Sequence, residues 1–327
     1  MAAVVEEPAW VRSTDVPSFR ERLRSLARSW HPDIVHIGYH VMAQYARELR
    51  ACPAPRVLTQ YEPGVTASRD AMQELRGLRR VRGRLELAAW VRYEQRAMSQ
   101  VDAIVVFTER DRQALATLAG GVPLVRIPLG TSIPAAPLNP CGASAPTVLF
   151  VGNFIHGPNV DAALWLMRSI FPLVSRVRPD ARLFVVGPNP PEEVTALAAQ
   201  QTITVTGAVA SVLPFLDDAT VVVAPLRTGG GMRVKVLEAL AAGKPVVASP
   251  LAVAGLDVTD GDQLMLGEQD QEFASAIVGL LENTDARRRL AESAREWAVR
   301  NLSWDHSLAA YEALHDQLLA AGDRFHV

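Results

Sequence analysis

Three consecutive glycines are followed by an arginine, a lysine and a glutamate within residues 228–244. The chain has 327 residues and only two lysines, Lys235 and Lys244, which both lie in this stretch. Consecutive glycines let a backbone approach a ligand closely, and a helix N-terminus carries about half a positive charge. Cations in a first turn oppose that dipole unless an anion binds there. The stretch therefore predicts a site for two linked phosphates, formed by Arg233, Lys235 and the backbone of Gly229, Gly230, Gly231 and Met232.

Glu238 predicts a second contact in the same stretch. It follows Lys235 by three residues on one helix face, and its carboxylate can accept two hydroxyl groups of a nucleotide ribose. The structural alternative is a solvated helix start with a weak surface pair between Lys235 and Glu238. The motif is neither a Walker sequence nor a G-x-G-x-x-G dinucleotide fingerprint.

Gly243 and Lys244 close the same helix. Gly243 is placed to cap a helix over residues 232–242, and Pro245 begins the next strand. The charge of Lys244 suits a helix C-terminus, so we expect a structural role. Its removal should then cost about a few tenths of a kcal/mol.

Short apolar segments alternate with helical patterns along the whole chain. In the second half we expect strands at 147–151, 182–186, 203–206, 220–224, 245–249 and 263–266, and helices at 160–176, 191–200, 212–216, 232–242, 272–282, 284–300 and 304–319. In the first half we expect strands at 34–37, 56–59, 103–107 and 124–127, and helices at 20–30, 41–50, 70–99 with a break near Gly77 or Gly83, and 109–118. This alternation predicts an α/β protein with two Rossmann-like, doubly wound parallel sheets, whose ligands bind at the carboxyl ends of strands.

A proline-rich stretch separates the two halves. Five prolines lie in residues 128–146, which we interpret as a linker. The predicted domains are residues 1–128 and 147–303, joined by the linker 129–146 and followed by a C-terminal helix in 304–327.

Composition excludes several classes of protein. The net charge of −2 gives no general electrostatic reason to bind nucleic acid. The sequence contains no run of 18 apolar residues, and its first residues lack a signal-peptide pattern. Cys52 and Cys141 stand apart from any metal-ligating pattern, so we expect reduced thiols, a cytoplasmic protein and no metal site.

Several motifs together resemble the donor domain of the family 4 retaining glycosyltransferases. They are Val151-Gly-Asn153, Pro158-Asn-Val-Asp-Ala162, Gly187-Pro-Asn-Pro, Val205-Thr-Gly207, residues 222–247, Ala254-Gly-Leu and Leu302-Ser-Trp304. The resemblance covers residues 146–320 closely and residues 31–130 more loosely. It belongs to the subgroup with a Gly-rich loop, and the combination is specific although no single piece is.

The resemblance implies a GT-B fold, in which two Rossmann-like domains hold a sugar nucleotide mainly through the C-terminal one. By position, Arg233 and Lys235 would bind the diphosphate and Glu238 the ribose, and the helix from Trp304 would brace the N-terminal, acceptor-side domain. The remaining donor contacts implied by the resemblance are Gly152, Asn153, Gly187, Gly207 and Val209.

The chain departs from the family at three places. Gly230 stands where the family often has a glutamate, and Tyr61-Glu62 replaces a His-Asn pair on the acceptor side. The N-terminal domain is also shorter than the family's, so we expect it to be incomplete. His36, His40 and His156 are candidates for contacts with substrate, although a lone histidine is more often structural.

These residues lead to a retaining, hexosyltransferase-type glycosyltransferase that uses a UDP-, GDP- or dTDP-sugar without metal or further cofactor. The acceptor would be a glycan, a lipid-linked molecule or a small molecule. A non-catalytic GT-B-like partner protein or fragment that binds sugar nucleotide is the alternative. A sugar-nucleotide epimerase is a third hypothesis, and it would need acid and base carboxylates that we cannot assign.

Residues 69–96 hold eight arginines against four acidic residues. A solvated helix pair is one interpretation. The other is a basic surface for anionic lipid, with an apolar side made by Leu85, Leu87, Trp90 and Val91, which would make the protein membrane-associated.

Overall fold

The computed structural model describes residues 7–142, 145–199, 201–229 and 233–322, and the chain divides into two compact units. The first unit comprises Met1–Leu129, Gly229–Met232 and Ser307–Val327. The second comprises Gly130–Thr228 and Arg233–His306. Each unit has its own parallel sheet, which confirms the predicted α/β class.

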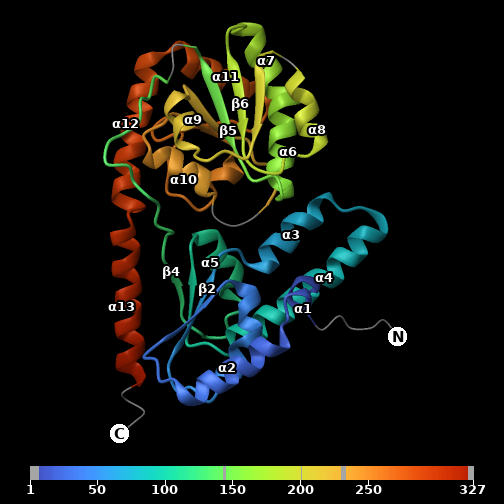
Figure 1. Cartoon of the computed structure of the whole chain (residues 1–327), viewed down its shortest axis with the longest axis vertical. Coiled ribbons are helices and arrows are strands. Elements are labelled where there is room, and N and C mark those ends of the chain that lie inside the picture. Colours follow the sequence, from blue (N-terminus) through green and yellow to red (C-terminus); the bar gives the residue numbers. More distant parts are fainter. Residues whose placement is uncertain (1–6, 143–144, 200, 230–232, 323–327) are drawn as a thin grey trace. The chain divides into compact units, whose positions relative to one another are not determined.

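The sheet of the first unit has four parallel strands in the order β1-β2-β3-β4 (Figure 1). The strands are β1 (Val35–Gly38), β2 (Arg56–Gln60), β3 (Ala103–Val106) and β4 (Leu124–Arg126). The helices are α1 (Ala9–Ser13), α2 (Pro17–Ser29), the 3₁₀ helix η1 (His40–Leu49), α3 (Gly64–Glu74), α4 (Gly77–Met98) and α5 (Glu109–Ala116). Helix α1 was not predicted from the sequence.

Two helices of the first unit differ in detail from the prediction. The helix expected over residues 41–50 is a 3₁₀ helix, and eight of its ten residues are buried. The helix expected over 70–99 breaks at Gly77, whose φ of +57° is left-handed.

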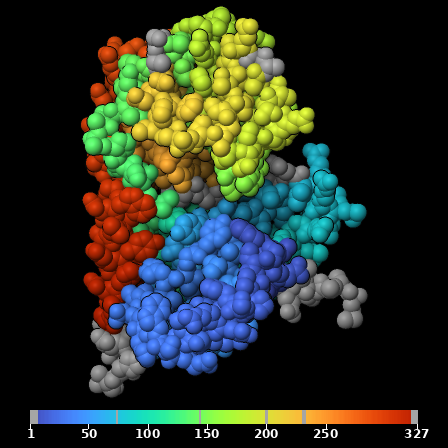
Figure 2. Space-filling view, viewed as in Figure 1, coloured from blue at the N-terminus to red at the C-terminus, as the bar shows by residue number. Residues whose placement is uncertain are grey.

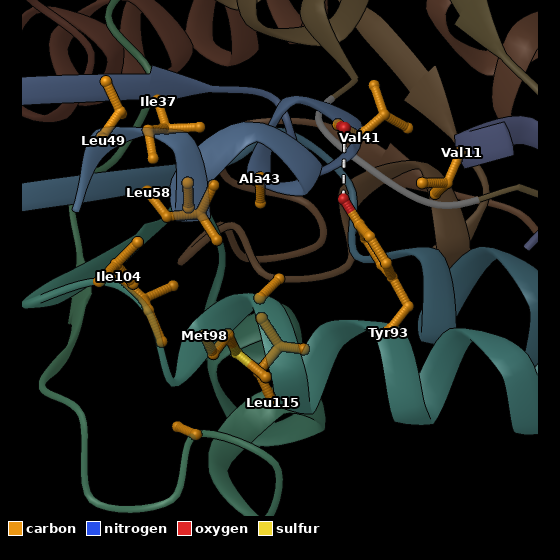
Figure 3. Close-up of a cluster of buried hydrophobic side chains, with 14 of the residues drawn as sticks. Val11, Ile37, Val41, Ala43, Leu49, Leu58, Tyr93, Met98, Ile104 and Leu115 are labelled. Atoms are coloured by element: carbon orange, nitrogen blue, oxygen red, sulfur yellow. Dashed lines mark hydrogen bonds between the residues drawn. The ribbon is translucent and has the colours of Figure 1, made fainter. Parts of the chain in front are cut away.

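Apolar side chains cover both faces of the first sheet. On one face Ile37, Leu58 and Ile104 pack with residues of η1, α4 and α5 (Figure 3). The hydroxyl of Tyr93 on α4 donates to the carbonyl of Val41 at 3.2 Å, so a polar group joins this core with its hydrogen bond satisfied. On the other face Val57, Val105 and their neighbours pack against Leu314 of α13 (Trp304–Gly322).

The second unit has six parallel strands in the order β10-β9-β8-β5-β6-β7 (Figure 1). They are β5 (Thr147–Val151), β6 (Arg182–Val186), β7 (Ile203–Gly207), β8 (Val221–Ala224), β9 (Val246–Ala248) and β10 (Met265–Leu266). The helices are α6 (Gly157–Trp165), the π-helical turn η2 (Leu166–Ile170), α7 (Phe171–Val177), α8 (Glu192–Thr195), η3 (Ala196–Ala199), α9 (Leu213–Asp218), α10 (Val234–Ala241), η4 (Pro250–Val253), α11 (Asp270–Glu282) and α12 (Thr284–Asn301). All six predicted strands are confirmed.

The helix expected over residues 160–176 is interrupted by the π-helical turn η2. Pro172 lies in the first turn of α7 and has no backbone N–H, so the hydrogen-bond ladder of a continuous helix is lost at this point. A local change to wider hydrogen bonding is a common response.

One apolar surface was assigned wrongly from the sequence. Trp90 is only 5% exposed, and Leu87 and Val91 pack against the same core. The exposed apolar side chains of α4 are instead Leu78 and Val81, together with Leu85. These three recur at helical spacing and form a different stripe on the surface of α4, which lies in the cyan segment of Figure 2. Among the described residues, no helix has both the length and the apolar character needed to span a bilayer.

Candidate functional site

The second sheet reverses its strand order between β5 and β8. From β5 the chain adds β6 and β7 on one side, and from β8 it adds β9 and β10 on the other. Ligands of doubly wound sheets bind outside the carboxyl ends of strands at such a switch point. The loops that leave it carry Gly152 and Asn153 after β5, and Arg227 and Thr228 after β8.

Lys235 lies in the first turn of α10, which follows the β8 loop. Arg233 occupies the N-cap position of this helix. The ammonium of Lys235 donates to Asn159 Oδ1 at 2.5 Å and lies 4.7 Å from the ring centre of Phe150. Burial, and after it the nearby charge of Arg233, lower the pKa of Lys235 to about 7. A cation in this environment gains from a bound anion, since an opposite charge restores its preference for the protonated form.

Glu238 lies one turn further along α10 and is exposed. Its partial burial raises the pKa of the carboxyl above its usual value. Among the described residues the ammonium of Lys235 bonds to Asn159 rather than to Glu238. The ribose contact of Glu238 stays a prediction.

Gly152 and Gly187 bring two loops into close contact. A Cβ on Gly187 would lie 1.8 Å from the carbonyl oxygen of Gly152, so neither loop tolerates a side chain there. The amide of Gly187 donates to the carbonyl of Gly207 at 3.2 Å, and the amide of Gly152 donates to the carbonyl of Val186 at 2.9 Å, so the ends of β5, β6 and β7 lie together. Both Gly152 and Gly187 are buried, and this close packing is sufficient to explain why both positions are glycine.

The structure also describes three further predicted site residues, Asn153, Val209 and Gly229. Asn153 accepts a hydrogen bond from Asn159 through its carbonyl oxygen at 2.7 Å and so joins the group around Lys235. Val209 is half-buried after β7. Gly229 has a φ of +96°, a backbone conformation that favours glycine. Gly230, Gly231 and Met232 lie outside the described residues.

Two residues of α6, Asn159 and Asp161, were not predicted from the sequence as part of the site. Asn159 holds Lys235, and Asp161 pairs with Arg227 of the β8 loop at 2.5 Å. The Arg227 guanidinium also lies 4.9 Å from the ring centre of Trp165. A sequence signal for them exists, because residues 158–162 are one of the motifs that carry the family resemblance. The motif alone gives no role for its individual residues.

Lys244 has a structural role, and it is more deeply buried than expected for a residue at a helix end. It is fully buried, and its ammonium donates to the carbonyl of Asn139 and, at 3.1 Å, to that of Asp217. Gly243 has a φ of +70°, and the amide of Lys244 donates to the carbonyl of Ala239 at 3.0 Å, which confirms the predicted glycine cap. The expected small cost of removing Lys244 is therefore wrong, because an exposed helix end was assumed.

The three histidine candidates have different surroundings. His40 is buried against Trp90, and burial lowers its pKa to about 4, as expected for a neutral core histidine. His36 lies with its Nε2 atom 2.7 Å from Nε2 of His315 on α13. His156 is exposed at the start of α6. Among the described residues no group of three or more His, Cys, Asp and Glu side chains could hold a metal ion.

Aromatic side chains gather at the carboxyl ends of β1 and β2 in the first unit. Tyr39 follows β1 with a φ of +79°, which is unusual for a residue with a side chain. Its ring centre lies 5.5 Å from that of Tyr61, which follows β2 and is 45% exposed. Glu62 lies near enough to raise the pKa of Tyr39, after the larger effect of burial.

Comparison with known proteins agrees with this geometry. Residues 145–283 match the family described as glycosyl transferases group 1. A phosphatidyl-myo-inositol mannosyltransferase of Mycobacterium leprae is 28% identical over 63% of this chain and 57% of its own length. The chain thus spans little more than half of this curated relative.

Solved structures with the same fold cover most of the chain. Sucrose-phosphate synthase from Thermosynechococcus elongatus has a TM-score of 0.76 and 20% identity, over 96% of this chain and 80% of that one. HepE of Anabaena, solved with UDP-glucose, has a TM-score of 0.69 and 14% identity over 91% of this chain and 82% of that one. The two parallel α/β units have the GT-B fold, and residues 145–283 match the family of group 1 glycosyl transferases.

Proposed function

We propose that the protein is a glycosyltransferase that takes a sugar from a nucleoside diphosphate donor. The observation that carries the proposal is the position of Lys235, a half-buried cation beside Arg233 at the switch point of the second sheet. Such a cation is unfavourable without an anion, and the loops around it leave the strand ends where nucleotides bind in doubly wound sheets. HepE, which shares the fold, was solved with UDP-glucose.

The proposed reaction proceeds with retention of anomeric configuration, as the resemblance to family 4 implies. The bond from the anomeric carbon to the phosphate oxygen breaks, and a bond to the acceptor oxygen forms on the same face of the sugar. The acceptor proton moves to the departing phosphate oxygen. Arg233 and Lys235 would stabilise the charge that develops on the diphosphate, which is the main catalytic contribution that the protein then has to make.

The acceptor would bind at the strand ends of the first unit. Tyr39, Tyr61 and Glu62 combine ring faces, hydroxyls and a carboxylate there. This combination suits a glycan, a lipid-linked sugar or a small molecule that offers hydroxyl groups. We propose a cytoplasmic location, in keeping with a nucleotide-sugar donor.

UDP, GDP or dTDP should stabilise the protein in the presence of EDTA. Arg233 and Lys235 would supply the positive charge that a divalent cation supplies elsewhere. At a concentration 100-fold above Kd the gain in unfolding free energy should be about 2.7 kcal/mol, measured as a rise in melting temperature. The matching nucleoside, which lacks phosphates, is the control. Stabilisation that appears only after Mg²⁺ or Mn²⁺ is added would contradict a metal-independent site.

We also propose that α4 contacts anionic membranes. Its exposed stripe of Leu78, Val81 and Leu85 is bordered by exposed arginines, which suits a surface with acidic lipid headgroups. These bordering residues are Arg79, Arg80, Arg82 and Arg84.

Vesicles that contain phosphatidylglycerol test the membrane contact. The double variant Leu78→Gln/Leu85→Gln should bind them about tenfold more weakly than the parent protein, because buried apolar area contributes to such binding. Val299→Gln is the control, since Val299 is 47% exposed on α12 of the other unit. Equal binding by all three proteins would contradict the contact.

A further inference from the structure

Asn159 is the residue of α6 that fixes the ammonium of Lys235. The two residues are 76 positions apart in sequence, and Asn159 Oδ1 accepts from Lys235 Nζ at 2.5 Å. The other end of the same amide is also engaged, because Nδ2 donates to the carbonyl of Asn153 at 2.7 Å. The orientation of the amide is therefore determined at both ends, with its oxygen toward the lysine.

The surroundings of Asn159 leave its side chain little freedom. Its backbone amide donates to the carbonyl of His156 at 2.9 Å, in the turn that opens α6. A Cβ added at Gly152 would lie 3.0 Å from the Asn159 side chain, so the loop after β5 packs directly on it. Phe150 lies on another side of the ammonium at 4.7 Å. Lys235 is thus held by one neutral oxygen and one aromatic face.

The side chain of Asn159 is uncharged, and this has a chemical consequence for the site. An aspartate at position 159 would hold the lysine equally well in geometry, but it would neutralise the ammonium and repel a diphosphate. The nearest acidic side chain on the same helix, Asp161, is engaged by Arg227. The charged group that acts on Lys235 is Arg233, another cation. The positive charge at the strand ends therefore remains available to an anion.

We propose that Asn159 is a positioning residue of the donor site, which holds the Lys235 ammonium in place for the diphosphate without cancelling its charge. This inference rests on the proposed function for the identity of the ligand. The role depends on the neutral amide and is distinct from simple packing.

The test compares Asn159→Asp and Asn159→Ala with the parent protein, using the tightest binder among UDP, GDP and dTDP. Titration calorimetry from pH 6 to pH 9 gives the affinity at each pH. Burial lowers the pKa of Lys235 to about 7, so affinity in the parent should fall as the pH rises above 7. In Asn159→Asp the new carboxylate stabilises the protonated form of Lys235. The pH at which affinity falls should therefore be higher by about one unit or more. At pH 6 the same variant should bind about tenfold more weakly, because the carboxylate repels the diphosphate.

Asn159→Ala should lose about three- to tenfold in affinity across the range, without the upward shift, because the ammonium loses its holder but gains no charge partner. Asn301→Asp is the matched control on α12, where the parent side chain bonds only its own helix at Trp297. It should leave both the affinity and its pH profile unchanged. Melting temperatures show whether each variant is folded.

The result that overturns the proposal is an Asn159→Asp protein that is folded and has the parent's affinity and pH profile. If the parent binds none of the three nucleotides, the proposed function fails, but the positioning role remains measurable. The pKa of Lys235, followed by NMR of ¹³C-labelled lysine in the free proteins, should still be higher in Asn159→Asp than in the parent. An unchanged Lys235 pKa would overturn the positioning role independently of any ligand.

Discussion

Lys235→Ala should weaken nucleoside diphosphate binding by about 1.5–3 kcal/mol, the range for hydrogen bonds to charged groups. The ammonium lies at the switch point of the second sheet, where a bound anion would offset its burial beside Arg233. Removing it takes away a charge that acts mainly when ligand is present, so the free energy of unfolding should change little. Titration calorimetry and thermal melts on the same protein measure the two quantities.

A matched control uses another cation of the second unit. Arg176 is exposed on α7, and Arg176→Ala should leave the nucleotide affinity unchanged. Equal affinities for the parent and Lys235→Ala would remove the main support for a phosphate site. A large loss of stability in Lys235→Ala would show instead that the lysine serves the fold.

Lys244→Ala should destabilise the protein by about 2–4 kcal/mol, while folded protein keeps its nucleotide affinity. The substitution leaves a cavity where a fully buried side chain was and removes the donor for the carbonyls of Asn139 and Asp217. Lys244→Met is the companion variant, because it fills most of the space but leaves both carbonyls without that donor. Its loss should be smaller, and the difference separates packing from hydrogen bonding.

The pH dependence of stability gives the Lys244 prediction a second measurement. Burial lowers the pKa of Lys244 from 10.5 to about 8, so between these values the unfolded chain binds more protons than the folded one. The unfolding free energy contributed by this residue therefore rises with pH from about 8 to about 10.5. Denaturant melts should show that rise in the parent relative to Lys244→Met. A constant difference between the two proteins across this window would contradict the burial of a titrating lysine.

The sequence was sufficient to predict the sheets because their signal is local. Runs such as Val221–Ala224 are apolar at every position, which is typical of a strand buried on both faces, and the alternation with helices then specifies parallel pairing. The cap at Gly243 is likewise local, since it depends on one residue after one helix. These features need no knowledge of distant contacts.

The contacts of the two lysines could not be predicted in the same way. Lys235 meets a residue 76 positions earlier, and Lys244 meets the linker 105 positions earlier. Both side chains look like surface residues in a sequence, and only the folded chain shows one half-buried and the other fully buried. The stripe on α4 was assigned wrongly for a related reason. A long helix with apolar residues on two sides has two possible inward faces, and the packing of Trp90 decides between them.

Binding of a nucleoside diphosphate at Lys235 can be measured directly because the chain has so few lysines. With ¹³C-labelled lysine the protein gives signals from only two side chains, Lys235 and Lys244, which single substitutions assign. Addition of the tightest binder among UDP, GDP and dTDP should shift the Lys235 signal and raise its pKa from about 7, while Lys244 stays unchanged. A nucleotide that binds without moving the Lys235 signal, or that moves only Lys244, would contradict the site.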